Sequence, residues 1–194
     1  MENNPPYAAI FLGIGTALFL IRFIYWKVTE VKADREKPRR DSAYSKKRLF
    51  TTSIALLVLL QLIGIDILPF PSSLLLQVVG LLLVVVGFAI SMEGRRALGV
   101  NWTHAAEYQI KKNHDLVTQS IYQWIRHPIY AGYFLSLIGI ELILSSYLCL
   151  IFGILGSLLL TMQASQEEKL LTEHFGQKYR DYKKITRRFL PFVW

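Results

Sequence analysis

Five long apolar stretches restrict the fold of this chain more than any other feature of its sequence. They lie roughly at 7–26, 49–68, 73–92, 129–144 and 147–162. A helix needs about 20 apolar residues to cross a bilayer, with a range of about 17–25. The pattern predicts an all-α, polytopic membrane protein with about five transmembrane helices, in which 1–194 form a single integral membrane domain. The last two stretches are short and separated only by two serines, which predicts a helical hairpin whose full passage through the bilayer stays open.

The basic residues predict the orientation of these helices. Of the 22 Lys and Arg, nine lie in 27–48, five in 93–128 and seven in 163–194, whereas the turns around 69–71 and 145–146 have none. Loops rich in Lys and Arg stay in the cytoplasm. We therefore expect the N-terminus outside and the C-terminus inside, with anionic lipid at the cytoplasmic face. The net charge of +8 then needs no nucleic-acid partner.

Arg22 and Glu141 are charged residues within the predicted helices. Arg22 belongs to the last turn of the first stretch, so we expect its side chain to snorkel to the cytoplasmic side. Glu141 lies four residues from the outer turn, which predicts an interfacial carboxyl group.

The segment RHPIYAG, 126–132, joins a polar loop to the fourth apolar stretch. Pro128 suits the first turn of a helix, whose free N–H groups can receive a carboxylate. His127 and Tyr130 are three residues apart and can face one ligand together. The alternative is that Arg126, His127 and Tyr130 only anchor the helix at the interface.

Other patterns of catalytic chemistry are absent from the sequence. The four histidines lie 10, 13 and 47 residues apart, which matches no zinc pattern, and the single cysteine adds no ligand. We therefore expect no metal. In the tail, Leu171, Phe175, Tyr179 and Tyr182 are spaced as one stripe of an amphipathic helix, which either lies on the membrane or covers a site.

The order of motifs in the C-terminal half resembles the isoprenylcysteine carboxyl methyltransferase family. The matching features are HDLV at 114–117, Tyr122, RHPIYAG, the hairpin, the pair Glu167–Glu168 and FGQKYRDY at 175–182. They cover about 99–191. The resemblance implies an integral membrane enzyme that uses S-adenosylmethionine, with a cytoplasmic loop and the C-terminal helix building the cofactor site.

The resemblance also implies roles for individual residues. The expected cofactor-binding residues are His114, Asp115, Leu116, Val117, Tyr122, His127, Pro128, Ile129, Tyr130, Glu167 and its neighbour Glu168. Gln163 stands where the family has a substrate-binding arginine, so Arg95 and Arg96 are candidates for that positive charge. No residue is assigned as a catalytic acid or base; Arg95, Arg96 and Glu167 are expected to position the reactants.

The acceptor implied by the resemblance is the carboxylate of a prenylated cysteine, or a similar lipidic carboxylate, entering from the bilayer. A carboxylate with a pKa of about 3.3–3.7 is already a nucleophile at neutral pH, so it needs no base. Three alternatives stay open: a phospholipid N-methyltransferase, a membrane reductase with a nicotinamide cofactor, and a membrane protein without enzymatic activity.

Overall fold

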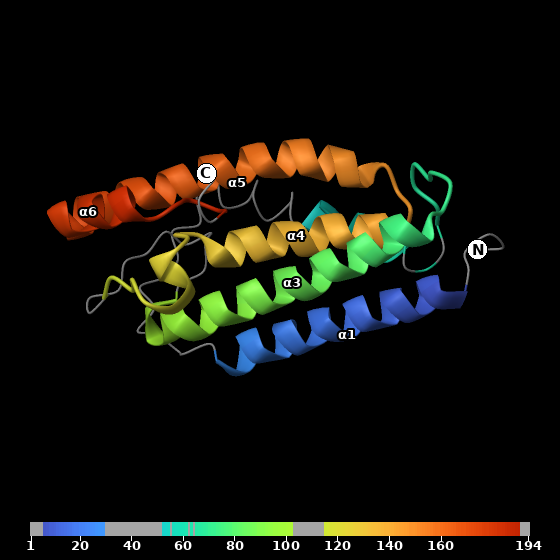
Figure 1. Cartoon of the computed structure of the whole chain (residues 1–194), viewed down its shortest axis with the longest axis horizontal. Helices are drawn as coiled ribbons and strands as arrows, with labels where there is room; N and C mark the ends of the chain where they lie inside the picture. Colours follow the sequence, from blue (N-terminus) through green and yellow to red (C-terminus); the bar gives the residue numbers. More distant parts are fainter. Residues whose placement is uncertain are drawn as a thin grey trace.

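A computed structural model describes residues 6–29, 52–54, 56–61, 63, 65–102 and 115–190. Over these residues the chain is helical, without strands, and has two isolated β-bridges, Pro69 with Ser146 and Ile125 with Arg187. The four long helices α1, α3, α4 and α5 lie roughly side by side, and the short α6 continues from α5 at one end (Figure 1). The all-α prediction is thus confirmed for the described part of the chain.

Three helices are long and apolar enough to cross a membrane: α1 (Pro6–Val28), α3 (Leu74–Leu98) and α5 (Leu148–Phe175). Large apolar side chains on them face outward, for example Phe23 at 53% exposure and Ile154 at 71%. Two further apolar helices are shorter, Thr52–Gln61 and α4 (Pro128–Ile143). At about 1.5 Å per residue, the 16 residues of α4 extend about 24 Å, less than the roughly 30 Å of a hydrocarbon core. The expected number of five spans stays a prediction.

Glycines bring α3 and α4 into close contact. Gly80 and Gly87 are seven residues apart on α3, as are Gly132 and Gly139 on α4, so each pair falls on one helix face. A Cβ atom added at Gly132 would lie 2.3 Å from the carbonyl oxygen of Gly87, and one at Gly139 would lie 2.4 Å from that of Gly80. Such backbone proximity is the usual way in which helices associate in lipid, where dispersion replaces the hydrophobic effect.

At the opposite end from α6, α4 and α5 are joined through Leu144–Tyr147. The loop before α3 contacts this connection, because the N–H of Phe70 donates to the carbonyl of Ser145 (2.8 Å) and the N–H of Tyr147 to that of Leu68 (2.8 Å). Glu141 lies just below, fully buried, and accepts a hydrogen bond from Gln61 Nε2 (3.0 Å). The carboxyl group is therefore enclosed by protein, and Gln61 is one of the residues that cover it; its position at the membrane interface stays a prediction.

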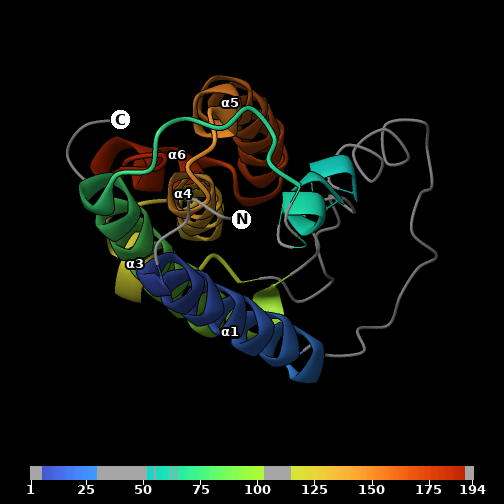
Figure 2. The ribbon, with the colours of Figure 1, turned by 90° about the vertical axis from the view of Figure 1, so that its right-hand side faces the viewer.

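The helix directions place all the polar segments of interest at one end. α1, α3 and α5 run toward the end that carries α6, and α4 starts there (Figures 1 and 2). Residues 115–127 and the tail therefore meet, as the one-sided distribution of basic residues predicted.

The tail differs from its predicted form. α5 continues without a break to Phe175, and Gly176, with a φ of 58°, ends it before α6 (Gln177–Ile185) begins. A single helix through Leu171, Phe175, Tyr179 and Tyr182 was therefore wrong. Glycine reaches this left-handed conformation at little cost, and the resulting turn buries Tyr179 and Tyr182 at 1% and 6% exposure.

Candidate functional site

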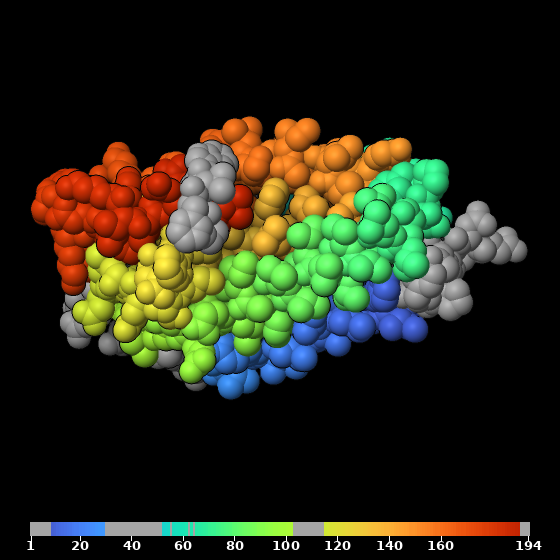
Figure 3. All heavy atoms as spheres, viewed as in Figure 1, coloured from blue at the N-terminus to red at the C-terminus, as the bar shows by residue number. Residues whose placement is uncertain are grey.

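The site begins with a backbone pairing between two segments about 60 residues apart. The N–H groups of Arg126 and His127 donate to the carbonyls of Arg187 and Arg188 at 2.8 and 3.0 Å, and the N–H of Arg187 donates to Trp124 at 3.0 Å. Space-filling atoms show the tail lying against the 115–127 segment (Figure 3). This pairing fixes the start of α4, where the sequence-predicted site residues cluster.

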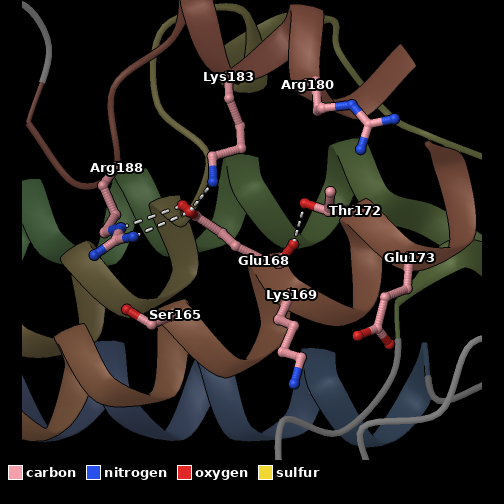
Figure 4. Close-up of a pocket in the computed structure, with 8 residues that line it drawn as sticks. All are labelled: Ser165, Glu168, Lys169, Thr172, Glu173, Arg180, Lys183 and Arg188. Atoms are coloured by element: carbon pink, nitrogen blue, oxygen red, sulfur yellow. Dashed lines mark hydrogen bonds and ion pairs between the residues drawn. The ribbon is translucent and has the colours of Figure 1, made fainter. Parts of the chain in front are cut away.

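Glu168 on α5 holds this pairing together by electrostatics. Its carboxylate is 2% exposed and accepts hydrogen bonds from Arg126 Nε at 2.9 Å and Arg188 Nη2 at 3.0 Å, while Lys183 Nζ lies 3.1 Å away. Figure 4 shows Lys183 and Arg188 converging on it. Both oxygens are engaged by the protein itself. Glu168 therefore acts as a clamp between α5, the start of α4 and the tail.

The neighbouring carboxylate, Glu167, has a different environment. It is 39% exposed, accepts a hydrogen bond from Tyr130 Oη at 2.9 Å and lies 3.5 Å from His127 Nδ1. These two partners orient the carboxylate, and its exposed part stays available to a ligand. Of the two glutamates, Glu167 is the one whose surroundings suit a binding role.

His127 lies between the two carboxylates. Its ring is stacked on that of Tyr130, with centroids 5.5 Å apart, and its Nε2 is 3.3 Å from Glu168 Oε1. Burial disfavours the imidazolium, but the hydrogen bonds and charges of Glu167 and Glu168 outweigh it and raise the pKa of His127. The ring therefore bridges the exposed carboxylate to the clamp.

Tyr122 lies beside this cluster, at the same end of the molecule. It lies in the short helix η2 (Ser120–Gln123), is 6% exposed, and its carbonyl accepts a hydrogen bond from Tyr182 Oη at 2.6 Å. Burial and, next, the charge of Glu167 raise the pKa of Tyr122 well above its usual value. Tyr122 is therefore close enough to Glu167 for its hydroxyl to respond to the charge of that carboxylate.

The other expected cofactor residues have varied positions. Asp115 is exposed, and its N–H donates to Asn101 Oδ1 at 3.0 Å; Leu116 and Val117 are half-buried. Pro128 is the first residue of α4, as predicted. Pro128 and Ile129 pack against α3 at Gly94. His114 lies outside the described residues.

The three residues expected near the substrate are not equivalent. Arg95 is 2% exposed, donates to the carbonyls of Thr29 (2.7 Å) and Gly99 (3.0 Å) and lies over the Trp102 ring at 4.4 Å. Arg96 has a side chain 79% exposed. Gln163 is half-buried on α5, one turn before Glu167. The contacts of Arg95 indicate that it ties α1 to the end of α3.

A cavity of about 420 Å³ lies between α5 and the tail, and Glu167 is not among the residues that line it (Figure 4). The sequence did not predict it. Its lining is rich in charge and consists of Ser165, Glu168, Lys169, Thr172, Glu173, Arg180, Lys183 and Arg188. Four of these side chains are basic and two are acidic, so the cavity has an excess of positive charge.

Sequence reasoning missed how Arg126, Lys183 and Arg188 act together. Arg126 was considered as a helix anchor, and Lys183 and Arg188 were only counted among the basic residues of 163–194, since nothing in the sequence shows that the three meet at one carboxylate. In the described part of the chain, no group of three His, Cys, Asp or Glu residues has the arrangement of a metal site.

The comparisons with known proteins all name methyltransferases. Residues 75–178 match the family model described as phospholipid methyltransferase. The chain is 34% identical over 119 residues to the protein-S-isoprenylcysteine O-methyltransferase of Xenopus laevis, and this match covers 61% of the chain and 41% of the relative. The human enzyme of the same name shows 34% identity with 61% and 42% coverage, and that of Dictyostelium discoideum 33% with 59% and 49%. The resemblance read from the sequence is confirmed, although the chain spans less than half the length of these relatives.

A solved structure shares the fold. It is described as the eukaryotic intramembrane Ras methyltransferase, isoprenylcysteine carboxyl methyltransferase. The match has a TM-score of 0.68 at 21% sequence identity, and it covers 97% of this chain and 68% of the other. The helical arrangement described above is therefore that of a known membrane enzyme.

Proposed function

Because the chain belongs to the phospholipid methyltransferase family, we propose that it transfers a methyl group from S-adenosylmethionine to the C-terminal carboxylate of an isoprenylated cysteine, or to a similar lipidic carboxylate. The observation that carries this proposal is Glu167. It is a partly exposed carboxylate on α5, held by Tyr130 and His127 from the start of the apolar helix α4. The names of the relatives favour the carboxylate acceptor.

The residues present fit the methyl donor. S-adenosylmethionine, when bound, supplies an electrophilic methyl group on a positively charged sulfur. Glu167 offers a carboxylate to the positive charges of such a molecule, and Tyr122, His127 and Tyr130 lie around it. With 114–117, Pro128 and Ile129 they make the set expected from the sequence. Glu168 belongs to this set only indirectly, because its oxygens are engaged by Arg126, Lys183 and Arg188.

The protein's part in the reaction is positioning and the exclusion of water. A carboxylate acceptor is ionised at neutral pH, so no side chain has to remove a proton. Orientation of two reactants can account for several kcal/mol of a barrier, about 7–11 in favourable systems. A polar donor arriving from the helix-end side and a lipidic acceptor arriving from the bilayer would meet beside Tyr130.

The environment of the protein follows from the same features. We place the end with α6 in the cytoplasm, since most basic residues of the described chain lie there, and we expect about five spans. The basic cavity of Figure 4 lies at this end, where anionic lipid headgroups would find positive charge.

The second candidate is phospholipid N-methylation, which the description of the family model favours. An amine acceptor is protonated at neutral pH and must lose a proton before transfer. Glu167 is the described carboxylate nearest to such a role, but it is already assigned to the positive charge of the methyl donor. This arrangement favours the carboxylate acceptor.

Two measurements test the proposal. Calorimetric titration of the purified protein with S-adenosylhomocysteine should show binding, and Tyr130→Ala or His127→Ala should weaken it about five- to a hundred-fold, as expected for about 1–3 kcal/mol of lost hydrogen bonding. Absence of binding would favour a reductase or a protein without enzymatic activity. With a radiolabelled methyl donor, N-acetyl-S-farnesylcysteine should be methylated and its carboxamide should not. Turnover of phosphatidylethanolamine alone would assign the protein to the second candidate.

A further inference from the structure

Arg22 is a buried cation within the α1 helix. It is 8% exposed and lies six residues before the end of α1. Its guanidinium carbon is 4.5 Å from the centre of the Tyr133 ring on α4 and 5.1 Å from that of Phe19. Phe19 lies one turn before Arg22 on α1, and Tyr133 lies five residues after the start of α4, so the guanidinium sits between the two helices. The protein encloses this side chain between two aromatic rings, whereas its snorkelling to the cytoplasmic side stays a prediction.

The charge of Arg22 has no anionic partner among the described residues. An arginine keeps its proton at any physiological pH, and taking a charge out of water is costly unless it is paired. Contacts with aromatic faces return about 2 kcal/mol when the cation is desolvated, which is less than the effective penalty of several kcal/mol for a buried ion. An ionisable residue kept within a membrane segment indicates a functional site.

Arg22 adjoins the candidate site through α4. Tyr133 and Tyr130 are three residues apart, so they are neighbours on one side of the helix, separated by about 4.5 Å along the axis. Tyr130 contacts Glu167 from α5, and Tyr133 contacts Arg22 from α1. Viewed along the bundle, α4 lies between α5 and α1 (Figure 2). Tyr133 is 50% exposed, so its ring is accessible beside Arg22.

We propose that Arg22, with Tyr133, binds the carboxylate of the lipidic acceptor. This inference rests on the proposed function and names the residue that recognises its substrate. The forked N–H groups of a guanidinium match the two oxygens of a carboxylate. Glu167 then attracts the cationic donor, and Arg22 attracts the anionic acceptor about one helical turn deeper in the membrane. The two opposite charges sort the reactants along one side of α4.

The test compares binding of N-acetyl-S-farnesylcysteine with that of its carboxamide, for purified protein in detergent saturated with S-adenosylhomocysteine. The unchanged protein should bind the acid about tenfold tighter than the amide, a ratio equivalent to about 1.4 kcal/mol. Arg22→Met should bring the ratio to about one while leaving affinity for S-adenosylhomocysteine unchanged. Lys27→Met, which removes a positive charge from the last turn of the same helix, is the matched control and should keep the preference.

Arg22→Lys retains the charge without the fork, and it should reduce the ratio several-fold in a protein that still binds S-adenosylhomocysteine. It decides the matter if the methionine variant does not fold. An undiminished tenfold preference in either variant, or no preference in the unchanged protein, would overturn the assignment. Loss of the preference in Arg22→Met, in a protein that never methylates the acid, would support Arg22 as the carboxylate site and refute the proposed reaction.

Discussion

Replacing each of the two adjacent glutamates of α5 by glutamine should change a different property: Glu168→Gln should lower thermal stability, and Glu167→Gln should lower ligand affinity. The Glu168 side chain is 2% exposed and neutralises Arg126, whose side chain is 9% exposed, together with Lys183 and Arg188. Removing one partner of a buried ion pair costs about 3–5 kcal/mol. The lower end applies here, because Lys183 and Arg188 are 39% and 24% exposed and water can reach them. At about 2–4 °C per kcal/mol, Glu168→Gln should lower the midpoint of thermal unfolding by about 6–12 °C.

Glu167→Gln changes the same atoms at a half-exposed position, so its effect on the midpoint should stay within about 2 °C. Its affinity for S-adenosylhomocysteine should fall about ten- to a hundred-fold, since a hydrogen bond to a charged group contributes about 1.5–3 kcal/mol. Both variants are measured in one detergent, by tryptophan fluorescence on heating and by calorimetric titration well below the lower midpoint. If Glu168→Gln leaves the midpoint unchanged, or if only Glu168→Gln loses binding, the division of the pair into a clamp and a ligand-binding group is refuted.

Three further predictions concern charge, packing and topology. The pKa of His127 is raised, so the charged ring stabilises the fold fully below about pH 6.5, and this contribution is lost as pH rises through the raised pKa. The difference in unfolding midpoint between the unchanged protein and His127→Asn should therefore shrink toward alkaline pH. A difference that stays constant with pH would contradict the assignment. Gly139→Ala places a Cβ 2.4 Å from a carbonyl oxygen of α3, so it should destabilise the protein by about 1–3 kcal/mol. Gly13→Ala is the control, because a Cβ there has nothing within 4 Å and should not destabilise the protein. Equal unfolding midpoints for the two variants would count against close α3–α4 packing. A cysteine that replaces exposed Ser72 should react with an impermeant maleimide from outside the cell, and a cysteine that replaces Ser120 or Gln177 should not. Labelling of Gln177→Cys from outside would contradict the proposed orientation.

The sequence predicted the elements of this fold better than their contacts. Hydropathy located α1, α4 and the start of α3 to within two residues, because each apolar run must be buried in lipid or protein as a unit, but α3 continues to Leu98, six residues beyond its expected end. It could not show that α5 continues to Phe175, since the polar residues after Met162 read as an interface and only the positive φ of Gly176 sets the real end. Burial of Glu141 was missed for a related reason: the cover comes from 52–61 and the loop before α3, distant in sequence.

The sequence predicted which residues form the candidate site, but it did not predict the different roles of Glu167 and Glu168. His127, Tyr130 and Glu167 do meet, as the spacing within RHPIYAG and the family resemblance implied. The different environments of Glu167 and Glu168 depend on which face of α5 meets the tail, and that requires the position of Arg188. Arg22 looked like an ordinary flanking charge, since its neighbours Phe19 and Tyr133 become visible only once α1 packs beside α4.

The pairing of Arg126 and His127 with Arg187 and Arg188 has a consequence for biosynthesis. The two halves of this pairing leave the ribosome about 60 residues apart, and α4 and α5 are synthesised between them. At a translation rate of about 5–20 residues per second, the first half waits several seconds for its partner while both helices enter the membrane. The pairing can therefore form only after α4 and α5 have been synthesised, so this end of the molecule is completed late in biosynthesis.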